Sequence, residues 1–290
     1  MAHHDPTARR VPGNGLEHRV FEWNGAGAAV GTALLLHGFM DAAGTWDLVA
    51  PHLVDAGLRV IAPDLRGFGD APRAPAGSYY HFPEYIADVA GIAAELVKEE
   101  PLFVVGHSMG GTVATLFAGT FPERVTRLAL LEGLGPPNNL PEHAPDRMRR
   151  WIADEEKYRA EPHRTLSRDE ALRRLCARHS NIDPAIVATR LPHLVTEVEG
   201  GRVVWKFDPI HRSTSPFPFF ASMYEAYAAR VTCPVLVVGG GPEGFHPEDE
   251  PKRIAAFAKA ESTSIDDAGH MMHWTRPERL AEMLIRFWKA

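Results

Sequence analysis

The feature that most constrains this chain is an apolar run that ends in a serine-containing turn. Residues 102–105 read Leu-Phe-Val-Val, Gly-His-Ser-Met-Gly follows at 106–110, and a helical pattern then continues to residue 119. A turn this sharp between a strand and a helix strains its central residue, so the positions two residues away must lack a Cβ. The pattern therefore predicts that Ser108 presents its hydroxyl at the carboxyl end of a parallel sheet, where ligands bind in open α/β folds.

Strand-like and helix-like segments alternate along the rest of the chain, which predicts an α/β fold with a mostly parallel central sheet and helices on both faces. The predicted strands are Arg19–Trp23, Thr32–Leu36, Arg59–Ala62, Leu102–Val105, Thr126–Leu131 and Pro234–Val238, with a short strand-like piece at Ser262–Ile265. The predicted core helices are Thr45–Asp55, Glu84–Lys98, Met109–Gly119 and Pro277–Trp288.

One long segment breaks this alternation and predicts an inserted cap. Residues 135–230 are rich in Pro, Arg, Glu and His, with helical patterns at Asp146–Tyr158 and Arg168–Arg178 and an exposed strand or irregular piece at Arg202–Phe207. A segment of this length is too long for a loop inside a compact domain. We expect a helical cap at 135–230 between two parts of one core domain, 1–134 and 231–290, although these helices could instead complete the core.

Composition narrows the class of protein. The chain has 290 residues, 45% of them hydrophobic and 23% charged, and a formal net charge of -6, which argues against nucleic acid as a partner. No apolar stretch is long enough for a membrane span, and the first residues lack the apolar region of a signal peptide. Cys176 and Cys233 fit no metal or redox spacing, so we expect free thiols and a cytoplasmic protein. Oligomeric state cannot be predicted from this sequence.

A serine hydroxyl is a weak nucleophile unless a nearby base accepts its proton. Near the end of the chain, His270 follows the flexible Gly269 on a loop before the last helix, which makes it the candidate base. His273 is the competitor, with loop support or pocket lining as its expected role. A zinc site built on these two histidines lacks a third ligand nearby in the sequence, and we expect no metal or organic cofactor.

Acyl chemistry also needs donors for the oxyanion that forms on attack. The backbone N–H of Met109, directly after Ser108, is one candidate. The strand at 32–36 ends in His37-Gly38, so the second candidate is the N–H of Phe39, with Met40 as the alternative. His37 itself is expected to be a structural histidine near the pocket.

Four motifs in order along the chain resemble the α/β-hydrolase superfamily. They are HGF at 37–39, DLRGFGD at 64–70, GHSMGG at 106–111 and GHMMHWTRPE at 269–278. The chain is most similar to capped esterase-like, C–C-hydrolase-like and serine-hydrolase-like members. Epoxide hydrolases and haloalkane dehalogenases resemble it overall but carry an aspartate as nucleophile, which Ser108 excludes. Within the second motif, Asp64 and Arg66 are expected to form a structural pair.

The resemblance implies a third catalytic group, an acid that orients the imidazole, and allows two places for it. Glu132 ends a buried strand, where a carboxylate without a partner would be unfavourable. Glu243 lies in a loop that matches the commoner acid position, with Glu in place of Asp. We favour Glu132 narrowly and keep Glu243 as the alternative.

A nucleophilic serine with a histidine base, an acid and oxyanion donors predicts acyl transfer through an acyl-enzyme. Aromatic residues in the cap favour a small or medium apolar ester as substrate, with Met40, His37, Trp151 and Phe219 as candidate pocket residues. The alternatives are C–C bond or thioester hydrolysis with the same residues, a non-catalytic receptor, and an acyltransferase or haloperoxidase-like side activity.

Overall fold

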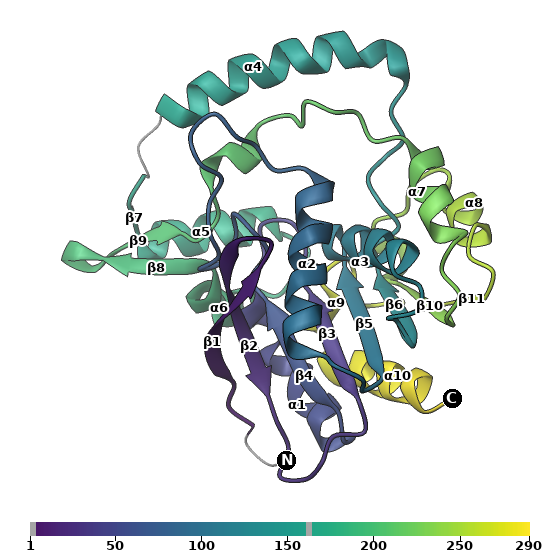
Figure 1. The fold of residues 1–290 in the computed structure, drawn as a ribbon. Helices are drawn as coiled ribbons and strands as arrows, with labels where there is room; N and C mark the ends of the chain where they lie inside the picture. The colour runs from purple at the N-terminus through teal and green to yellow at the C-terminus, as the bar shows by residue number, and fades with distance from the viewer. Residues whose placement is uncertain (1–3, 161–163) are drawn as a thin grey trace.

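The computed structural model describes residues 4–160 and 164–290 (Figure 1). Its strands are β1 (Thr7–Gly13), β2 (Leu16–Trp23), β3 (Thr32–Leu36), β4 (Arg59–Pro63), β5 (Leu102–His107), β6 (Arg127–Leu131), β7 (Leu166–Ser167), β8 (Val195–Val198), β9 (Arg202–Trp205), β10 (Val235–Gly239) and β11 (Ala260–Ser264). Its α-helices are α1 (Ala50–Asp55), α2 (Phe82–Leu96), α3 (Met109–Thr120), α4 (Ala144–Ala160), α5 (Arg168–Arg178), α6 (Pro184–Leu194), α7 (Ala221–Ala228), α8 (Glu250–Ala255), α9 (Met272–Thr275) and α10 (Pro277–Lys289). Its 3₁₀ helices are η1 (Ala43–Leu48), η2 (Pro141–His143), η3 (Glu199–Gly201), η4 (Pro209–Arg212) and η5 (Gly241–Glu243).

The central sheet has eight strands within the described residues, in the order β1-β2-β4-β3-β5-β6-β10-β11. Neighbouring strands pair in parallel along β4-β3-β5-β6-β10-β11. At one edge, β2 pairs antiparallel with β4, and β1 pairs antiparallel with β2. Pro12 lies in the edge strand β1, a position where its missing N–H is tolerated. The predicted α/β sheet is therefore confirmed, although the sequence did not predict β1.

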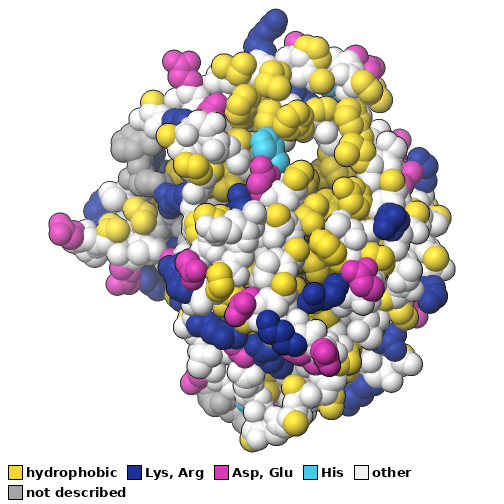
Figure 2. Space-filling view, in the orientation of Figure 1, with side chains coloured by type: hydrophobic (Ala, Val, Ile, Leu, Met, Phe, Trp, Pro, Cys, Tyr) yellow, Lys and Arg dark blue, Asp and Glu magenta, His cyan; other side chains and the backbone are white. Residues whose placement is uncertain are grey.

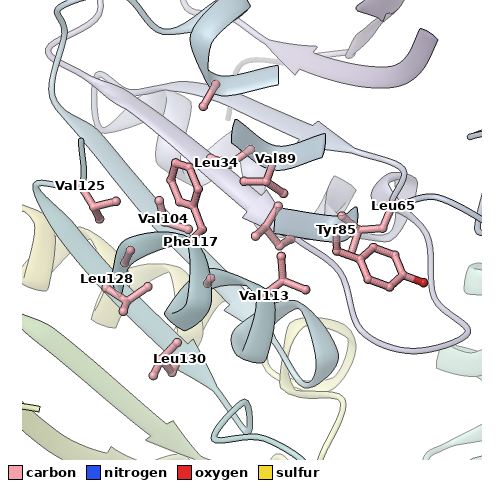
Figure 3. Close-up of a cluster of buried hydrophobic side chains, with 14 of the residues drawn as sticks. Leu34, Leu65, Tyr85, Val89, Val104, Val113, Phe117, Val125, Leu128 and Leu130 are labelled. Carbon is pink, nitrogen blue, oxygen red and sulfur yellow. The ribbon is translucent and has the colours of Figure 1, made fainter. Parts of the chain in front are cut away.

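Alternate residues of the central strands pack on opposite faces of the sheet. In β3, Leu34 and Leu36 face the cluster formed with α2 and α3, whereas Ala33 and Leu35 face the cluster formed with α1 and α10. Figure 3 shows the first cluster, in which Val113 and Phe117 of α3 lie over the sheet beside residues of its strands. Burial on both faces explains why the central strands are apolar throughout rather than alternating.

Residues 135–230, predicted to form the cap, contain helices and a small sheet. Helices α5 and α6 and the antiparallel sheet β7-β9-β8 share an apolar cluster that packs against Ala42, Met271 and Trp274. Helix α4 has no buried residue and crosses above the rest of the molecule as an arch (Figure 1). Helix α7 packs against α3, and a hydrogen bond joins them: Tyr224 Oη lies 3.0 Å from Thr115 Oγ1.

Two local predictions were wrong in detail. Thr45–Asp55 is not one helix but η1 followed by α1, and Pro51 at the start of α1 cannot donate the backbone hydrogen bond that would join them. The piece at Arg202–Phe207, predicted to be an exposed strand or an irregular segment, contains the strand β9. Its predicted exposure was wrong, because β9 pairs with both β7 and β8 and buries Val203.

Two further features concern membranes and thiols. No helix in residues 4–160 or 164–290 is long and apolar enough to cross a bilayer. Cys176 and Cys233 are both free, and Cys233 is buried at the base of β10. Burial raises the pKa of the Cys233 thiol to about 11, so it stays protonated and weakly reactive near neutral pH.

Candidate active site

The carboxyl ends of β3, β5 and β6 lie side by side, and each is followed by a strained residue. Among the described residues other than glycine, positive φ angles occur at Met40 (59°), Ser108 (52°) and Glu132 (52°), and at Asn14 (49°) in a hairpin turn. Such angles are unfavourable for residues with a Cβ and concentrate at functional sites. We call residues 37–41, 106–110, 131–133 and 269–273 the strand-end site.

Ser108 occupies the sharp turn between β5 and α3. Its N–H donates to Leu131 O of the neighbouring strand at 2.9 Å, which fixes the turn to the sheet. A Cβ on Gly106 would collide with Gly110 O, and a Cβ on Gly110 would collide with Leu36 O. The glycines of the motif are therefore required by close backbone contacts on both sides of the serine.

His270 contacts Glu132 across 138 residues of sequence. Its Nδ1 lies 3.3 Å from Glu132 Oε2, and because a carboxylate only accepts, Nδ1 donates; in the neutral imidazole the lone pair is then on Nε2. The Glu132 side chain has no exposed surface, whereas that of His270 is 34% exposed. The imidazole therefore combines a fixed inner nitrogen with a face open to solvent.

The Glu132 carboxylate is held by backbone donors as well as by His270. It accepts hydrogen bonds from the N–H groups of Gly240 and Phe245, on the loop after β10. Burial alone would raise its pKa, but the hydrogen bonds from His270, Phe245 and Gly240 outweigh burial and keep the pKa of Glu132 below its ordinary value. The carboxylate is thus ionised in the pH range where an imidazole can act as a base.

Glu243, the alternative acid, lies on η5 within the loop that donates these N–H groups. Its side chain is exposed, and the hydrogen bond of His270 Nδ1 goes to Glu132 instead. This loop therefore closes around the Glu132 carboxylate, a tertiary contact that neither motif reveals.

The loop after β3 lies against the serine. A Cβ on Gly38 would lie 3.2 Å from Ser108 Cβ, so the backbone that leads to Phe39 passes beside Ser108. The Phe39 ring is exposed and contacts the rings of Phe68 and His211 edge-on, while Met40 packs partly into the core. Met109 is the first residue of α3, where the backbone N–H groups of a helix have no partner within it.

His37 holds this loop through hydrogen bonds inside the fold. It is completely buried, its Nε2 accepts from Leu65 N at 2.9 Å, and its Nδ1 lies 2.8 Å from Gly38 O, to which it therefore donates. Because both nitrogens are used inside the fold, the side chain does not line an open pocket. This corrects the predicted pocket position of His37 and agrees with its expected structural role.

His273 also lies inside the fold. It is fully buried, and its Nε2 lies 3.0 Å from Asp41 Oδ2 on the loop after β3. Sequence reasoning did not single out Asp41; the available signal was an acidic residue two positions after the predicted oxyanion donor.

Asp64 and Arg66 do not pair with each other, contrary to expectation. Asp64 accepts from the N–H groups of Ala43 and Asp70, whereas Arg66 binds Asp88 of α2. The physical reason is that Asp64 is buried among backbone donors at the end of β4, while the longer Arg66 reaches the neighbouring helix.

Two aromatic residues predicted to line the pocket, Trp151 and Phe219, pack against other aromatic rings. The Trp151 ring of α4 contacts Tyr79 with ring centres 5.7 Å apart, and Phe219 contacts Phe82 and Tyr224. Figure 2 shows hydrophobic side chains gathered around an opening below the level at which α4 crosses in Figure 1. The opening is therefore lined largely by hydrophobic side chains, with histidine and acidic side chains at one side of it.

Comparison with known proteins gives relatives of several kinds. A serine hydrolase-like protein of Danio rerio is 33% identical over 177 residues, which are 59% of this chain and 53% of that protein. Epoxide hydrolase A of Mycobacterium tuberculosis is 36% identical over 126 residues, 43% of this chain and 38% of that protein. The matches thus span about half of one curated relative and less of the other.

A solved structure agrees over almost the whole chain. The M. tuberculosis esterase Rv0045c superposes with a TM-score of 0.76 at 22% identity, covering 98% of this chain and 92% of that chain. At this identity the likeness shows the fold alone. A protein-family model described as "alpha/beta hydrolase fold" matches residues 33–277. Because that match covers most of the chain, this protein belongs to the α/β-hydrolase fold family.

Proposed function

We propose that this chain is a serine hydrolase that cleaves carboxylic esters of small or medium apolar substrates. Ser108 Oγ attacks the ester carbonyl while His270 Nε2 accepts its proton. The proton then passes to the departing alcohol, which leaves an acyl group on Ser108. A water, deprotonated by the same imidazole, releases the carboxylic acid and restores the serine.

The pairing of His270 Nδ1 with Glu132 carries this proposal. A proton held on Nδ1 leaves Nε2 basic, and the buried carboxylate stabilises the imidazolium that forms during attack. The lowered pKa of Glu132 keeps this carboxylate charged. Glu132 is therefore the acid of the triad, and Glu243 is a member of the loop that surrounds it.

The oxyanion donors are the N–H groups of Met109 and Phe39. Met109 begins α3, so its N–H adds the favourable end of a helix dipole to a hydrogen bond. Phe39 follows Gly38, whose backbone passes beside Ser108. Met40, with its positive φ, turns the chain away immediately afterwards.

Substrate preference is attributed to the cap, residues 135–230, closing over an apolar surface. Trp151 and Phe219 supply aromatic walls, and the exposed rings of Phe39 and Phe245 lie on loops that flank the reacting groups. Such a lining favours apolar acyl or aryl groups over charged ones. Epoxide hydrolysis is not proposed, because Ser108 stands where the resemblance implies an aspartate.

A fluorophosphonate probe and a series of p-nitrophenyl esters test this function together. Ser108-dependent labelling with ester turnover supports the proposal, and Ser108→Ala should remove both. Labelling without ester turnover would redirect the search to thioesters and C–C bonds, whereas slow or absent labelling would indicate a receptor. Turnover that survives Ser108→Ala would contradict the proposed nucleophile.

A further inference from the structure

A second carboxylate–imidazole contact lies beneath the candidate active site. Asp41 Oδ2 and His273 Nε2 are 3.0 Å apart, and both side chains are buried. The other oxygen of Asp41 accepts from Ala42 N at 2.9 Å and from Thr45 Oγ1 at 2.8 Å. The contact joins the loop that carries Phe39 to the segment that carries His270.

His107 connects this contact to both catalytic groups. Its ring centre lies 4.5 Å from that of His273 and 4.8 Å from that of His270. Its Nε2 donates to His270 O at 2.8 Å, and the next residue in the chain is Ser108. Loops from three distant parts of the sequence therefore meet in one buried cluster.

His270 depends on these backbone contacts for its position. Its side chain is about a third exposed and is held at Nδ1 by Glu132, while Gly269 before it adopts φ 64°. The His107 bond fixes the His270 carbonyl, and three residues later the His273 ring is fixed by Asp41 and packs on Trp46 at 4.8 Å. On the other side, Gly269 N donates to Gly240 O at 2.9 Å, so the base is anchored on both sides along the chain.

We propose that Asp41 and His273 are positioning residues that hold the His270 loop in register with the oxyanion loop. Neither touches the reacting atoms; they act through the backbone of residues 38–41 and 269–273. This inference rests on the proposed function. A shift of about 1 Å in such a loop can lower the rate of a reaction about 100-fold.

The chain offers a matched control pair. Asp47 of η1 contacts His193 of α6 with Oδ2 and Nε2 also 3.0 Å apart, and Asp47 binds Arg190 as well. This pair joins η1, which Asp41 also contacts through Thr45, to the predicted cap. It involves neither the loop at 38–41 nor the loop at 269–273. Its loss should affect packing without moving His270.

The test compares His273→Phe with His193→Phe. Phenylalanine keeps the ring over Trp46 and removes the hydrogen bond. Because His273→Phe leaves the Asp41 carboxylate buried without its partner, the double variant Asp41→Asn/His273→Phe is made as well. Asp41→Asn alone is the conservative variant, since its amide can still donate to the other tautomer of His273.

We expect His273→Phe and the double variant to lower kcat per titrated active site by about 10- to 100-fold, with KM changed less than about 2-fold. Fluorophosphonate should label Ser108 more slowly by a similar factor. Asp41→Asn should lose less, and His193→Phe should keep the wild-type kcat. Unchanged kcat per titrated site in both His273 variants, or equal losses in His193→Phe, would overturn the proposal.

Two further measurements distinguish this proposal from a failure of the ester proposal and from a metal site. If wild-type protein is labelled but hydrolyses no ester, the ester proposal fails, while labelling rates still test the pair. The ligand atoms of Asp41, His107 and His273 lie within 4.8 Å of one another, which is also the composition of a zinc site. Stoichiometric zinc binding that disappears in Asp41→Asn/His273→Phe would overturn the positioning role in favour of a metal site.

Discussion

The strand-end site lies at the carboxyl edge of the sheet, and the arch of residues 136–160 crosses above that edge (Figure 1), but the two are held in different ways. The strand-end site is built from buried strands, strained turns and side chains with fixed partners, such as Glu132 with its two backbone donors. The arch includes α4, which buries no side chain and is largely charged. Under the proposed function, the difference predicts that the core fixes the chemistry, whereas the arch influences substrate choice.

The two regions also differ in backbone strain. Strain at Ser108 and Glu132 persists only because the surrounding sheet determines the backbone there. The arch has no positive φ angle at residues 136–160, and its apolar residues Met148 and Ile152 are exposed, while Trp151 packs on Tyr79. Changes in the strand-end site should therefore alter rate strongly, and changes in the arch should alter selectivity weakly.

The largest expected effect is at Ser108. Ser108→Ala should lower kcat by about 10⁶-fold, because without the nucleophile only the oxyanion donors and binding remain. Ser108→Gly should abolish activity equally but raise the free energy of unfolding by about 1 kcal/mol relative to Ser108→Ala, since glycine relieves the positive φ. Ester hydrolysis and denaturant unfolding measure the two effects. Equal stability of the two variants would contradict strain at this turn.

Glu132→Gln comes next. An amide at this position favours the wrong imidazole tautomer, so kcat should fall by about 10⁴-fold while the fold is retained. Glu243→Gln is the matched control on the adjacent loop, and we expect a change of less than about 2-fold because its side chain is exposed. Steady-state kinetics of the two variants decide between the glutamates. A large loss in Glu243→Gln alone would reverse the assignment.

Sequence reasoning predicted the parts of the strand-end site that depend on local pattern. Ser108 and His270 are marked by a strand, glycines and a helix within a few residues. The choice between Glu132 and Glu243 depends on how the loop after β10 folds over β6, and the Asp41–His273 contact joins residues 232 apart. Such contacts leave no periodic signal, because they form only when the sheet is assembled.

The fold also has parts that the local sequence pattern predicts and parts that it does not. The apolar runs of β3, β5, β6 and β10 identify buried parallel strands directly. Helix α4 was also predicted from its pattern, yet nothing in that pattern indicates which parts of the chain it contacts. Asp154 accepts from Thr214 N, Trp151 packs on Tyr79 and Arg159 binds Ser78 O. These contacts join distant parts of the sequence, which makes the position of the arch the least predictable part of the molecule.

Substitutions in the core should lower the free energy of unfolding more than substitutions on the arch. Leu128→Ala removes a fully buried side chain between the sheet and its helices, and we expect the free energy of unfolding to fall by about 2–5 kcal/mol. Ile152→Ala on the arch, where the side chain is 56% exposed, should change it by less than about 0.5 kcal/mol. Denaturant titrations compare them. A comparable loss in both variants would mean that the arch packs onto the core more tightly than its burial indicates.

The smallest expected effect is a change of selectivity at Trp151. Its ring packs edge-on against Tyr79, whereas the next residue, Ile152, faces solvent. Trp151→Ala should lower kcat/KM for a p-nitrophenyl hexanoate by about 10-fold and leave the acetate nearly unchanged, because only the longer acyl chain reaches the lost wall. Ile152→Ala is the control and should preserve the ratio. If Trp151→Ala lowers both esters equally, the arch affects the strand-end site itself, and the separation of chemistry from substrate choice does not hold.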